Sequence, residues 1–333
     1  MKNFLVLVRP YGMLFLGFTP VFGAIANGEF DFFHLTLLLV IGVLAHIFTF
    51  VQNDYYDIWV DSKSKYVSNR PLVTGGISKK KAFVIFFSSF VISILIATIF
   101  FFTIYSLSML LISFLLMTFY NKYSKHFFGM EYILGAGVFA YGLFGALTVS
   151  NNVSFFVIIV TAAGFMQWLF SVGISANLKD VEFDTKQGIR TTPTVFGVHV
   201  VGQKLLIPSS FWVYAFGVKI VHIFIVSLLF FLGYTSIFIY GLPIPGICFL
   251  IISLSLLYLT IKILSTPIVK RDKMLIYAGL QEGFALLLIT LALTSYIAEN
   301  TGIIQIILLI FLFILWPLFW FRSLYGKKMI PLE

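Results

Sequence analysis

The sequence predicts an all-α polytopic membrane protein, a bundle of nine or ten transmembrane helices. Of its 333 residues, 60% are hydrophobic and only 11% are charged, and the mean hydropathy is +1.03. Soluble domains usually have about 45–50% apolar and about 25% charged residues, so a soluble enzyme is excluded. The apolar runs are long and continuous rather than alternating over about ten residues, which favours helices over membrane strands. The single cysteine, Cys248, lies in such a run, so neither a disulfide framework nor a cysteine metal cluster is expected.

Ten stretches are long enough to cross a bilayer, which takes about 20 mostly apolar residues. In chain order they are 10–27, 34–56, 82–102, 104–120, 130–150, 154–177, 206–232, 236–262, 274–297 and 302–321. The seventh is the least regular, because Lys219 lies midway along it with His222 one turn further on. A lysine inside a span is costly and often functional, but a misplaced helix boundary explains it equally well.

The distribution of positive charge predicts the orientation. If the N-terminus is cytoplasmic, 21 of the 22 Lys and Arg residues lie on the cytoplasmic side, and the opposite loops hold no cation. Both termini and the long polar loops are therefore expected in the cytoplasm, and the membrane is the plasma membrane if the protein is prokaryotic. This asymmetry also accounts for the net charge of +9, so the bilayer is an expected partner and nucleic acid is not. No obligate protein partner is inferred.

The first long polar stretch, 53–81, begins at the end of the second span. Asn53, Asp57 and Asp61 are spaced by four, so on a helix they share one face. Like charges at this spacing repel each other, which predicts that something positive lies against them. Asp54 points elsewhere on the helical wheel and is a weaker candidate.

The second polar stretch, 177–204, follows the sixth span and repeats the spacing with Asp180 and Asp184, while Glu182 points elsewhere. Carboxylates without His or Cys are hard oxygen ligands, which suit Mg²⁺ completed by water and substrate phosphates. Two such faces at the same membrane depth predict a clamp for a metal-bridged diphosphate. The alternative is a pair of solvated helix ends bound to nearby lysines, and the presence of two motifs favours the metal.

Cationic and hydroxyl side chains accompany both motifs. Arg70 is suited to bidentate phosphate binding, and Pro71 with Gly75-Gly76 predicts a turn that folds its loop back over the site. The other candidates are Lys63, Lys65, Tyr120, Lys122, Lys125, Lys186 and Arg190. A solvated or headgroup-facing role is equally compatible with each lysine, and we assign that role to Lys79-Lys80-Lys81.

These motifs carry a resemblance to a known family. Asn53-x3-Asp57-x3-Asp61 with Asn69-Arg70-Pro71-Leu72, and Asp180-x3-Asp184 with Gly188-Ile189-Arg190-Thr191-Thr192, resemble the UbiA superfamily of intramembrane prenyltransferases. Arg9-Pro10 and Tyr120 are lesser matches, and the resemblance covers 1–265. It implies one domain over 1–333, with a central cavity and a polar cap on the cytoplasmic side. Family members usually have nine spans, so 302–321 is a candidate additional tenth helix.

The resemblance also implies a reaction. Two Mg²⁺ ions carry a polyprenyl diphosphate, and their ligands and catalytic carboxylates are Asn53, Asp57, Asp61, Asp180 and Asp184. The leaving diphosphate is neutralised by Arg70, Lys125 and Tyr120, with Lys65, Lys122, Lys186 and Arg190 as weaker candidates. Such chemistry is physically reasonable here, because metal ions and fixed cations stabilise charge on a leaving diphosphate and a dry site protects an allylic cation from water.

The acceptor stays open at this point. An aromatic quinone precursor is slightly favoured over a prenylglycerol phosphate for ether lipids, and intramolecular cyclisation of the prenyl chain is a third variant. His46, Gln167 and Glu282 are polar residues inside spans that would suit an aromatic ring, although an ordinary buried polar role explains each better. A secondary transporter is the rival from a different class, but it would concentrate ionisable residues near the midplane, where only Lys219, His222 and Glu282 lie.

Overall fold

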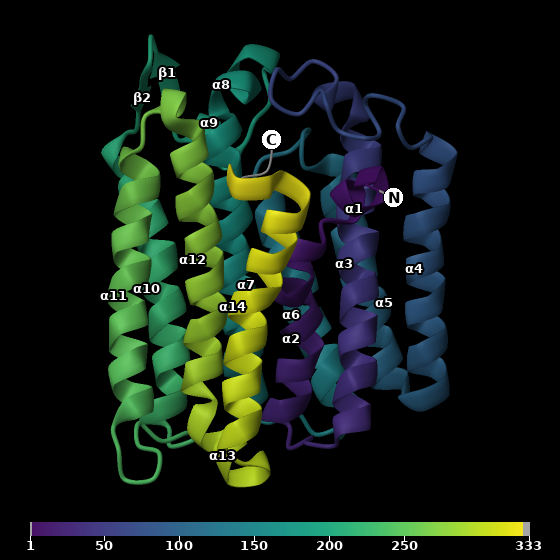
Figure 1. The fold of residues 1–333 in the computed structure, drawn as a ribbon, viewed down its shortest axis with the longest axis vertical. Helices are drawn as coiled ribbons and strands as arrows, with labels where there is room; N and C mark the ends of the chain where they lie inside the picture. Colours follow the sequence, from purple (N-terminus) through teal and green to yellow (C-terminus); the bar gives the residue numbers. More distant parts are fainter. Residues whose placement is uncertain (1, 329–333) are drawn as a thin grey trace. The chain divides into compact units, whose positions relative to one another are not determined.

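The structure is a computed structural model that describes residues 2–328. Within them, ten helices are long and apolar enough to cross a membrane, which confirms an all-α polytopic membrane protein (Figure 1). All ten predicted spans correspond to these helices, and the candidate tenth span is the helix Ile303–Tyr325. The eighth span begins later than predicted, at Ile244, because Gly233 and Gly241 adopt positive φ in the turn before it.

The chain forms two compact units. The first unit comprises the described residues within 1–122, 140–153 and 314–333, and the second comprises 123–139 and 154–313. Two helices, α6 (Met130–Leu147) and α14 (Ile303–Tyr325), contribute residues to both units. A single domain over 1–333 stays a prediction.

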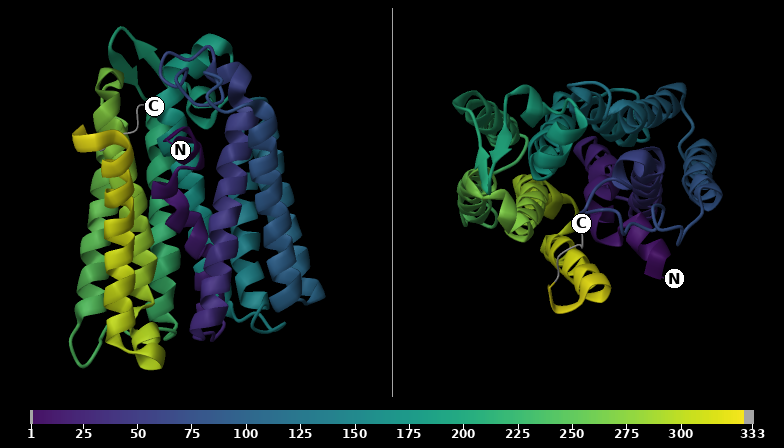
Figure 2. Two further views of the ribbon diagram at one scale, coloured as in Figure 1. Left: turned by 45° about the vertical axis from the view of Figure 1, so that its right-hand side comes forward. Right: turned by 90° about the horizontal axis from the view of Figure 1, so that it is seen from above.

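The first unit packs around a long helix that carries the first acidic motif. Its elements are α1 (Lys2–Val8), a 3-10 turn (Pro10–Gly12), α2 (Met13–Ala26), α3 (Phe32–Asp61), α4 (Lys79–Phe100), α5 (Ile104–Tyr123), the later parts of α6 and α14, and a final 3-10 turn (Gly326–Lys328). Helix α3 packs against both α2 and α4 (Figure 2). A Cβ on Gly42 would overlap the Gly17 backbone of α2, and one on Gly145 would overlap Pro20. Small residues thus let these backbones approach closely, which is a main source of helix association in lipid.

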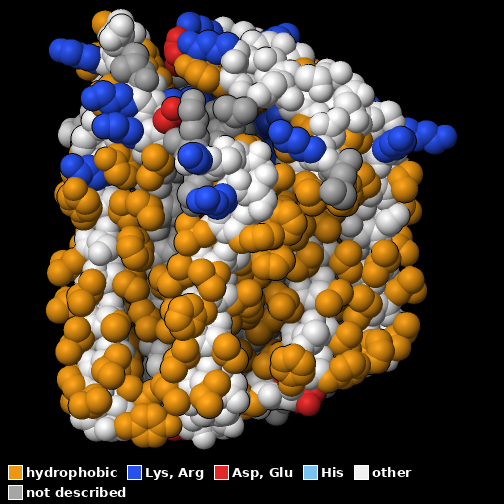
Figure 3. Space-filling view, in the orientation of Figure 1, with side chains coloured by type: hydrophobic (Ala, Val, Ile, Leu, Met, Phe, Trp, Pro, Cys, Tyr) orange, Lys and Arg blue, Asp and Glu red, His pale blue; other side chains and the backbone are white. Residues whose placement is uncertain are grey.

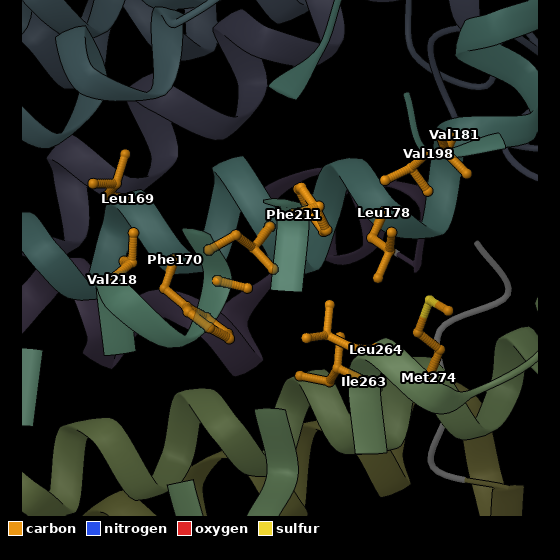
Figure 4. Packing of buried hydrophobic residues seen from close by; sticks show 12 residues of the cluster. Leu169, Phe170, Leu178, Val181, Val198, Phe211, Val218, Ile263, Leu264 and Met274 are labelled. Atoms are coloured by element: carbon orange, nitrogen blue, oxygen red, sulfur yellow. The ribbon is translucent and has the colours of Figure 1, made fainter. Parts of the chain in front are cut away.

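The second unit carries the second acidic motif. Its elements are α7 (Phe155–Phe170), a π-helical segment (Ser171–Ala176), α8 (Asn177–Gln187), α9 (Thr192–Val195), β1 (His199–Val201), β2 (Lys204–Leu206), α10 (Ser209–Phe231), α11 (Ile244–Ser265), a 3-10 turn (Ile268–Lys270), α12 (Arg271–Ala292), α13 (Thr294–Thr301) and the earlier parts of α6 and α14. Leu178 and Val181 of α8 are fully buried in a cluster with Phe211, Ile263 and Met274 (Figure 4). This cluster anchors one face of α8 to α10, α11 and α12.

The sequence did not lead us to expect strands, and for 199–206 this was wrong. β1 and β2 pair antiparallel, with Val201 opposite Lys204. Gly202 has a φ of +62°, as the tight two-residue loop of a hairpin requires. The long apolar runs excluded membrane strands but did not reveal this turn in a polar loop.

The surface of each unit fits a bilayer. Large hydrophobic side chains are exposed along α4, α5, α11 and α14, as expected for helices that face lipid. In each unit taken by itself, Lys and Arg side chains gather at one end of the helices, and hydrophobic ones cover the rest of the visible face (Figure 3). The protein is therefore an integral multi-pass membrane protein, while the cytoplasmic location of the basic ends stays a prediction.

Candidate functional site

The first acidic motif lies at the C-terminal end of α3, as predicted. Helix α3 begins at its N-cap Asp31, whose side chain accepts a hydrogen bond from the His34 amide, and continues without interruption to Asp61. Asn53 is half-buried, and Asp57 and Asp61 are buried. The helix therefore brings these three predicted ligands to one face.

Two arginines from distant parts of the chain lie against this end of α3. Arg70 Nη1 donates to Asp61 Oδ2 at 2.8 Å and to Asp54 Oδ1 at 3.1 Å, and Arg9 Nη2 donates to the same Asp54 oxygen at 2.7 Å. The predicted return of the Arg70 loop to the motif is confirmed. The positive charge that the repulsion between the aspartates requires is also present.

Asp54 was undervalued by the helical-wheel argument. It is only 3% exposed and is the carboxylate that binds both arginines. At about 100° per residue, positions 54 and 61 are about 20° apart around the helix, closer than positions 53 and 61. A search for acidic residues spaced by three or four, rather than strictly by four, would have grouped Asp54 with Asp57 and Asp61.

Arg9 reaches Asp54 from an unusual backbone conformation. Its φ of 49° and ψ of 62° are left-handed, which is uncommon for a residue other than glycine. This conformation joins α1 to the 3-10 turn Pro10–Gly12, and the Arg9 guanidinium carbon lies 5.3 Å from the centre of the Phe50 ring. In the sequence, only the Arg9-Pro10 pair, a lesser match to the family, pointed to a role for Arg9.

Three other predicted residues of the first unit are Lys65, Lys122 and Tyr120. Lys65 is exposed, with its ammonium 4.8 Å from the centre of the Tyr66 ring. Lys122 is exposed and Tyr120 is half-buried, both near the C-terminal end of α5. Their binding of diphosphate stays a prediction.

The second acidic motif lies on α8. Asp184 is 1% exposed, and its Oδ2 accepts a hydrogen bond from the Thr191 hydroxyl at 3.3 Å. Its Oδ1 is buried and has no hydrogen-bond partner among residues 2–328. A buried carboxylate oxygen without a partner is costly, so Asp184 Oδ1 is a candidate position for a ligand.

Asp180 has a different partner. Its Oδ1 accepts from Arg271 Nη2 at 2.8 Å, and Arg271 also donates to the Lys179 carbonyl. The ammonium of Lys125 acts electrostatically on both Asp180 and Asp184. Arg271, a buried residue at the start of α12, was not predicted as a site residue.

The loop after α8 has a local explanation in its sequence. Gly188, with a φ of +67°, ends the helix in the left-handed conformation that glycine adopts without strain. The chain turns back, the Ile189 amide donates to the Asp184 carbonyl, and Thr191 then caps α9 in a box with Thr194. This turn brings the Thr191 hydroxyl to Asp184.

Glu131 of α6 is a second residue that the sequence did not single out. It is 4% exposed, and its carboxylate accepts a hydrogen bond from Thr192. Its side chain also packs where a Cβ on Gly173 of the π-helical segment would lie. Glu131 therefore contacts the chain on both sides of the second motif.

Two predicted residues of this unit lie apart from the aspartates. Lys186 is 68% exposed and forms an ion pair with Glu182 at 2.7 Å. Arg190 is exposed in the turn after α8. The structure does not bring Lys186 to Asp180 or Asp184, because position 186 lies on the solvent side of α8 with Glu182.

The donor chemistry of both motifs fits Mg²⁺. All of the donors are carboxylate, amide or hydroxyl oxygens, the ligands that this hard cation prefers. Within residues 2–328, no three His, Cys, Asp or Glu side chains come together as a complete metal site. Mg²⁺ usually takes only one or two carboxylates and completes its shell with water and phosphate.

Solved structures of several proteins share this fold. A structure described as that of digeranylgeranylglyceryl phosphate synthase is 21% identical, with a TM-score of 0.58, covering 91% of this chain and 98% of that one. A UbiA homologue from Archaeoglobus fulgidus, bound to DMAPP and Mg²⁺, is 20% identical, with a TM-score of 0.59 and coverages of 87% and 99%. The apo UbiA homologue from Aeropyrum pernix K1 is 14% identical, with a TM-score of 0.65 and coverages of 86% and 97%.

No curated protein sequence matches the chain. The sequence does match the UbiA prenyltransferase family over residues 14–261, which includes both acidic motifs and most of the spans. The match ends within α11, so it includes neither α12 nor α14. The chain therefore belongs to the UbiA prenyltransferase family and is an intramembrane prenyltransferase.

Proposed function

We propose that this prenyltransferase binds a polyprenyl diphosphate through Mg²⁺ and transfers the prenyl group to a small acceptor. The observation that carries the proposal is the buried Asp184 Oδ1, which lacks a hydrogen-bond partner among the described residues while lying in a set of oxygen donors. The Archaeoglobus homologues were solved with DMAPP or GPP and Mg²⁺, which supports the same donor here. The rival transporter function has no support in the family match.

In this proposal each acidic motif serves one Mg²⁺ ion. Asn53, Asp57 and Asp61 are the ligands from the first unit, and Asp180 and Asp184 are those from the second. Bound Mg²⁺ stabilises negative charge on the diphosphate as it leaves. We propose two ions because the chain has two acidic motifs.

The fixed cations of the chain then act on the diphosphate. Arg70 in the first unit and Lys125 in the second are the main candidates, since both are already close to carboxylates of their motif. Tyr120, Lys65, Lys122 and Arg190 are further candidates, whereas Lys186 would first have to leave its surface ion pair with Glu182. Fixed positive groups favour charge that develops in the transition state, because they need no reorganisation at the moment of reaction.

The reaction breaks the allylic C–O bond, and its electron pair leaves with the diphosphate. A nucleophilic atom of the acceptor attacks the allylic carbon and then loses a proton. Hydrophobic side chains around the prenyl chain exclude water that would otherwise capture the cation. With the basic ends of the helices on the cytoplasmic side, the diphosphate would be drawn from the cytoplasmic leaflet.

We propose an aromatic quinone precursor as the acceptor, as the sequence suggested. A prenylglycerol phosphate is the second candidate, favoured by the fold neighbour described as digeranylgeranylglyceryl phosphate synthase. The two differ in charge, because a phosphorylated acceptor needs cations besides those that bind the diphosphate. Lys63, which is exposed and is not assigned to the diphosphate, is a candidate for that role.

The proposal is tested with the purified full chain in lipid nanodiscs. C10 to C20 prenyl diphosphates are offered with aromatic acids, quinone precursors or prenylglycerol phosphate, in Mg²⁺ or in EDTA. Diphosphate release and product masses are measured. We expect Mg²⁺-dependent release and one prenylated acceptor, whereas a hydrocarbon product alone would indicate cyclisation. Release that is unchanged in EDTA would contradict the proposed role of Mg²⁺.

Two substitutions connect this activity to the motifs. Asp57→Ala and Asp184→Ala are each expected to lower turnover about a hundredfold or more, because each removes a metal ligand without removing core packing. Glu182→Ala is the matched control, since this carboxylate lies on α8 but is bound to Lys186 at the surface. Full activity in Asp184→Ala would show that the second motif does not bind the metal.

A further inference from the structure

The second unit contains a buried polar network that the proposed reaction does not use. Lys219 Nζ of α10 donates to Gln167 Oε1 of α7 at 2.9 Å and lies 3.4 Å from His222 Nδ1. Gln167 Nε2 donates to Glu282 Oε2 of α12 at 3.0 Å. The Gln167 carbonyl accepts a hydrogen bond from the Ser171 amide. One chain of polar contacts thus links three helices.

Lys219 is a true intramembrane lysine and not the product of a misplaced helix boundary. It lies in the middle of α10 and is 0% exposed, and its ammonium is 4.2 Å from the centre of the Phe170 ring. Burying a charge in a membrane protein is costly, and replacing a buried ion pair by apolar residues is often neutral or stabilising. Packing alone therefore does not explain the presence of Lys219 and Glu282.

The network meets α7 where the winding of this helix changes. Gln167 and Ser171 are four residues apart, on one face of α7, and Ser171 is the first residue of the π-helical segment Ser171–Ala176. A π turn contains one more residue than an α turn, so it rotates everything after it by about 100° around the helix axis. The helix that follows directly is α8, with Asp180 and Asp184.

We propose that Lys219, Gln167 and Glu282 form a positioning network that holds α7 at the start of the π-helical segment and thereby aims the carboxylates of α8. The network holds the start of the segment, and Glu131 packs on Gly173 further along it. Its members do not touch the diphosphate. This inference rests on the proposed function, because it assumes that Asp180 and Asp184 bind Mg²⁺.

The decisive variant is Lys219→Met/Glu282→Gln, which removes both charges together and so avoids leaving one buried and unpaired. We expect it to fold and to raise the Mg²⁺ concentration for half-maximal activity about tenfold, as for other groups that orient metal ligands. The rate at saturating Mg²⁺ should change much less. A merely structural role would lower thermal stability without this shift.

Thr290→Val is the matched control, because it deletes a fully buried hydroxyl of α12 that bonds only to the Leu286 carbonyl in the contacts described. Its Mg²⁺ dependence should equal that of the wild type. Hydrogen exchange gives a second readout: residues 177–187 should exchange faster in Lys219→Met/Glu282→Gln but not in Thr290→Val. Unchanged Mg²⁺ dependence in the folded double variant would overturn the inference.

A milder variant decides the matter if the double variant does not fold. Gln167→Met removes only the amide that joins Lys219 to Glu282, and we expect a smaller shift in the same direction. Absence of that shift overturns the inference. Asp184→Ala separates the two proposals: if it stays active, the proposed function fails, whereas if it is inactive and the network variants behave as wild type, only the positioning role fails.

Discussion

The two acidic motifs share a four-residue spacing, but their carboxylates have different partners. In the first unit, Asp54 and Asp61 accept hydrogen bonds from the guanidinium groups of Arg9 and Arg70. In the second unit, Asp184 accepts only a hydroxyl bond among the contacts described, and its Oδ1 is unpartnered. The negative charge of the first motif is thus compensated by fixed cations, whereas Asp184 is open to a ligand.

This difference shows that spacing alone does not determine how a carboxylate pair works. Like charges four residues apart must be separated, neutralised or protonated. The first motif is neutralised by arginines from elsewhere in the sequence, so Mg²⁺ must compete with Arg70 for Asp61. The second motif divides the roles, because Asp180 binds Arg271 while Asp184 keeps a vacant oxygen. We therefore expect the first motif to be more important for stability and the second for binding the metal.

The largest effect on stability is expected from Asp54→Ala. It leaves Arg9 and Arg70 without their shared carboxylate, and breaking a buried ion pair in this way costs about 3 kcal/mol. The free energy of unfolding, measured by denaturant titration in mixed micelles, should fall by that amount. Asp54→Asn is the control, because its amide oxygen can still accept both hydrogen bonds and the loss should be smaller. Equal stability of Asp54→Ala and wild type would show that the arginines do not depend on this carboxylate.

The sequence predicted the spans and the placement of both motifs, because bilayer thickness fixes helix length and the four-residue spacing fixes a helix face. All ten predicted spans correspond to helices. The first motif, at positions 53, 57 and 61, lies at the C-terminal end of α3, and the second motif, at positions 180 and 184, lies on α8. These properties depend on residues close in the chain.

Contacts between distant residues were not predictable in the same way. Glu131 bonds Thr192, Arg271 bonds Asp180, and Lys219 bonds Gln167, all across large sequence separations. Each of these hydrogen bonds depends on which helices pack together, and the composition of the sequence does not determine the packing. The π-helical segment was also missed, because its hydrophobic pattern does not differ from that of an ordinary span.

The next largest effect sharpens the comparison in the first unit. Arg70→Lys loses the planar fork, so we expect the KM for prenyl diphosphate to rise about tenfold while kcat changes less. The exposed Arg322→Lys at the end of α14 is the matched control and should leave KM unchanged. If Arg70 serves only to neutralise Asp54 and Asp61, Arg70→Lys will lower stability and leave KM at the wild-type value.

The smallest effect tests whether Asp184 depends on its hydroxyl partner. Thr191→Val removes the 3.3 Å hydrogen bond to the Oδ2 carboxylate oxygen. This bond is long for an O–H donor, so we expect it to contribute only about 0.5–1 kcal/mol although its acceptor is charged. The expected loss in kcat/KM is therefore about two- to fivefold, and Thr191→Ser should restore it. Thr194→Val weakens the same capping box without touching Asp184, so it measures the contribution of the cap alone. Equal losses of kcat/KM in Thr191→Val and Thr194→Val would assign the effect to the cap. A loss far above tenfold in Thr191→Val alone would mean that Asp184 depends on its hydroxyl partner as strongly as the first motif depends on its arginines.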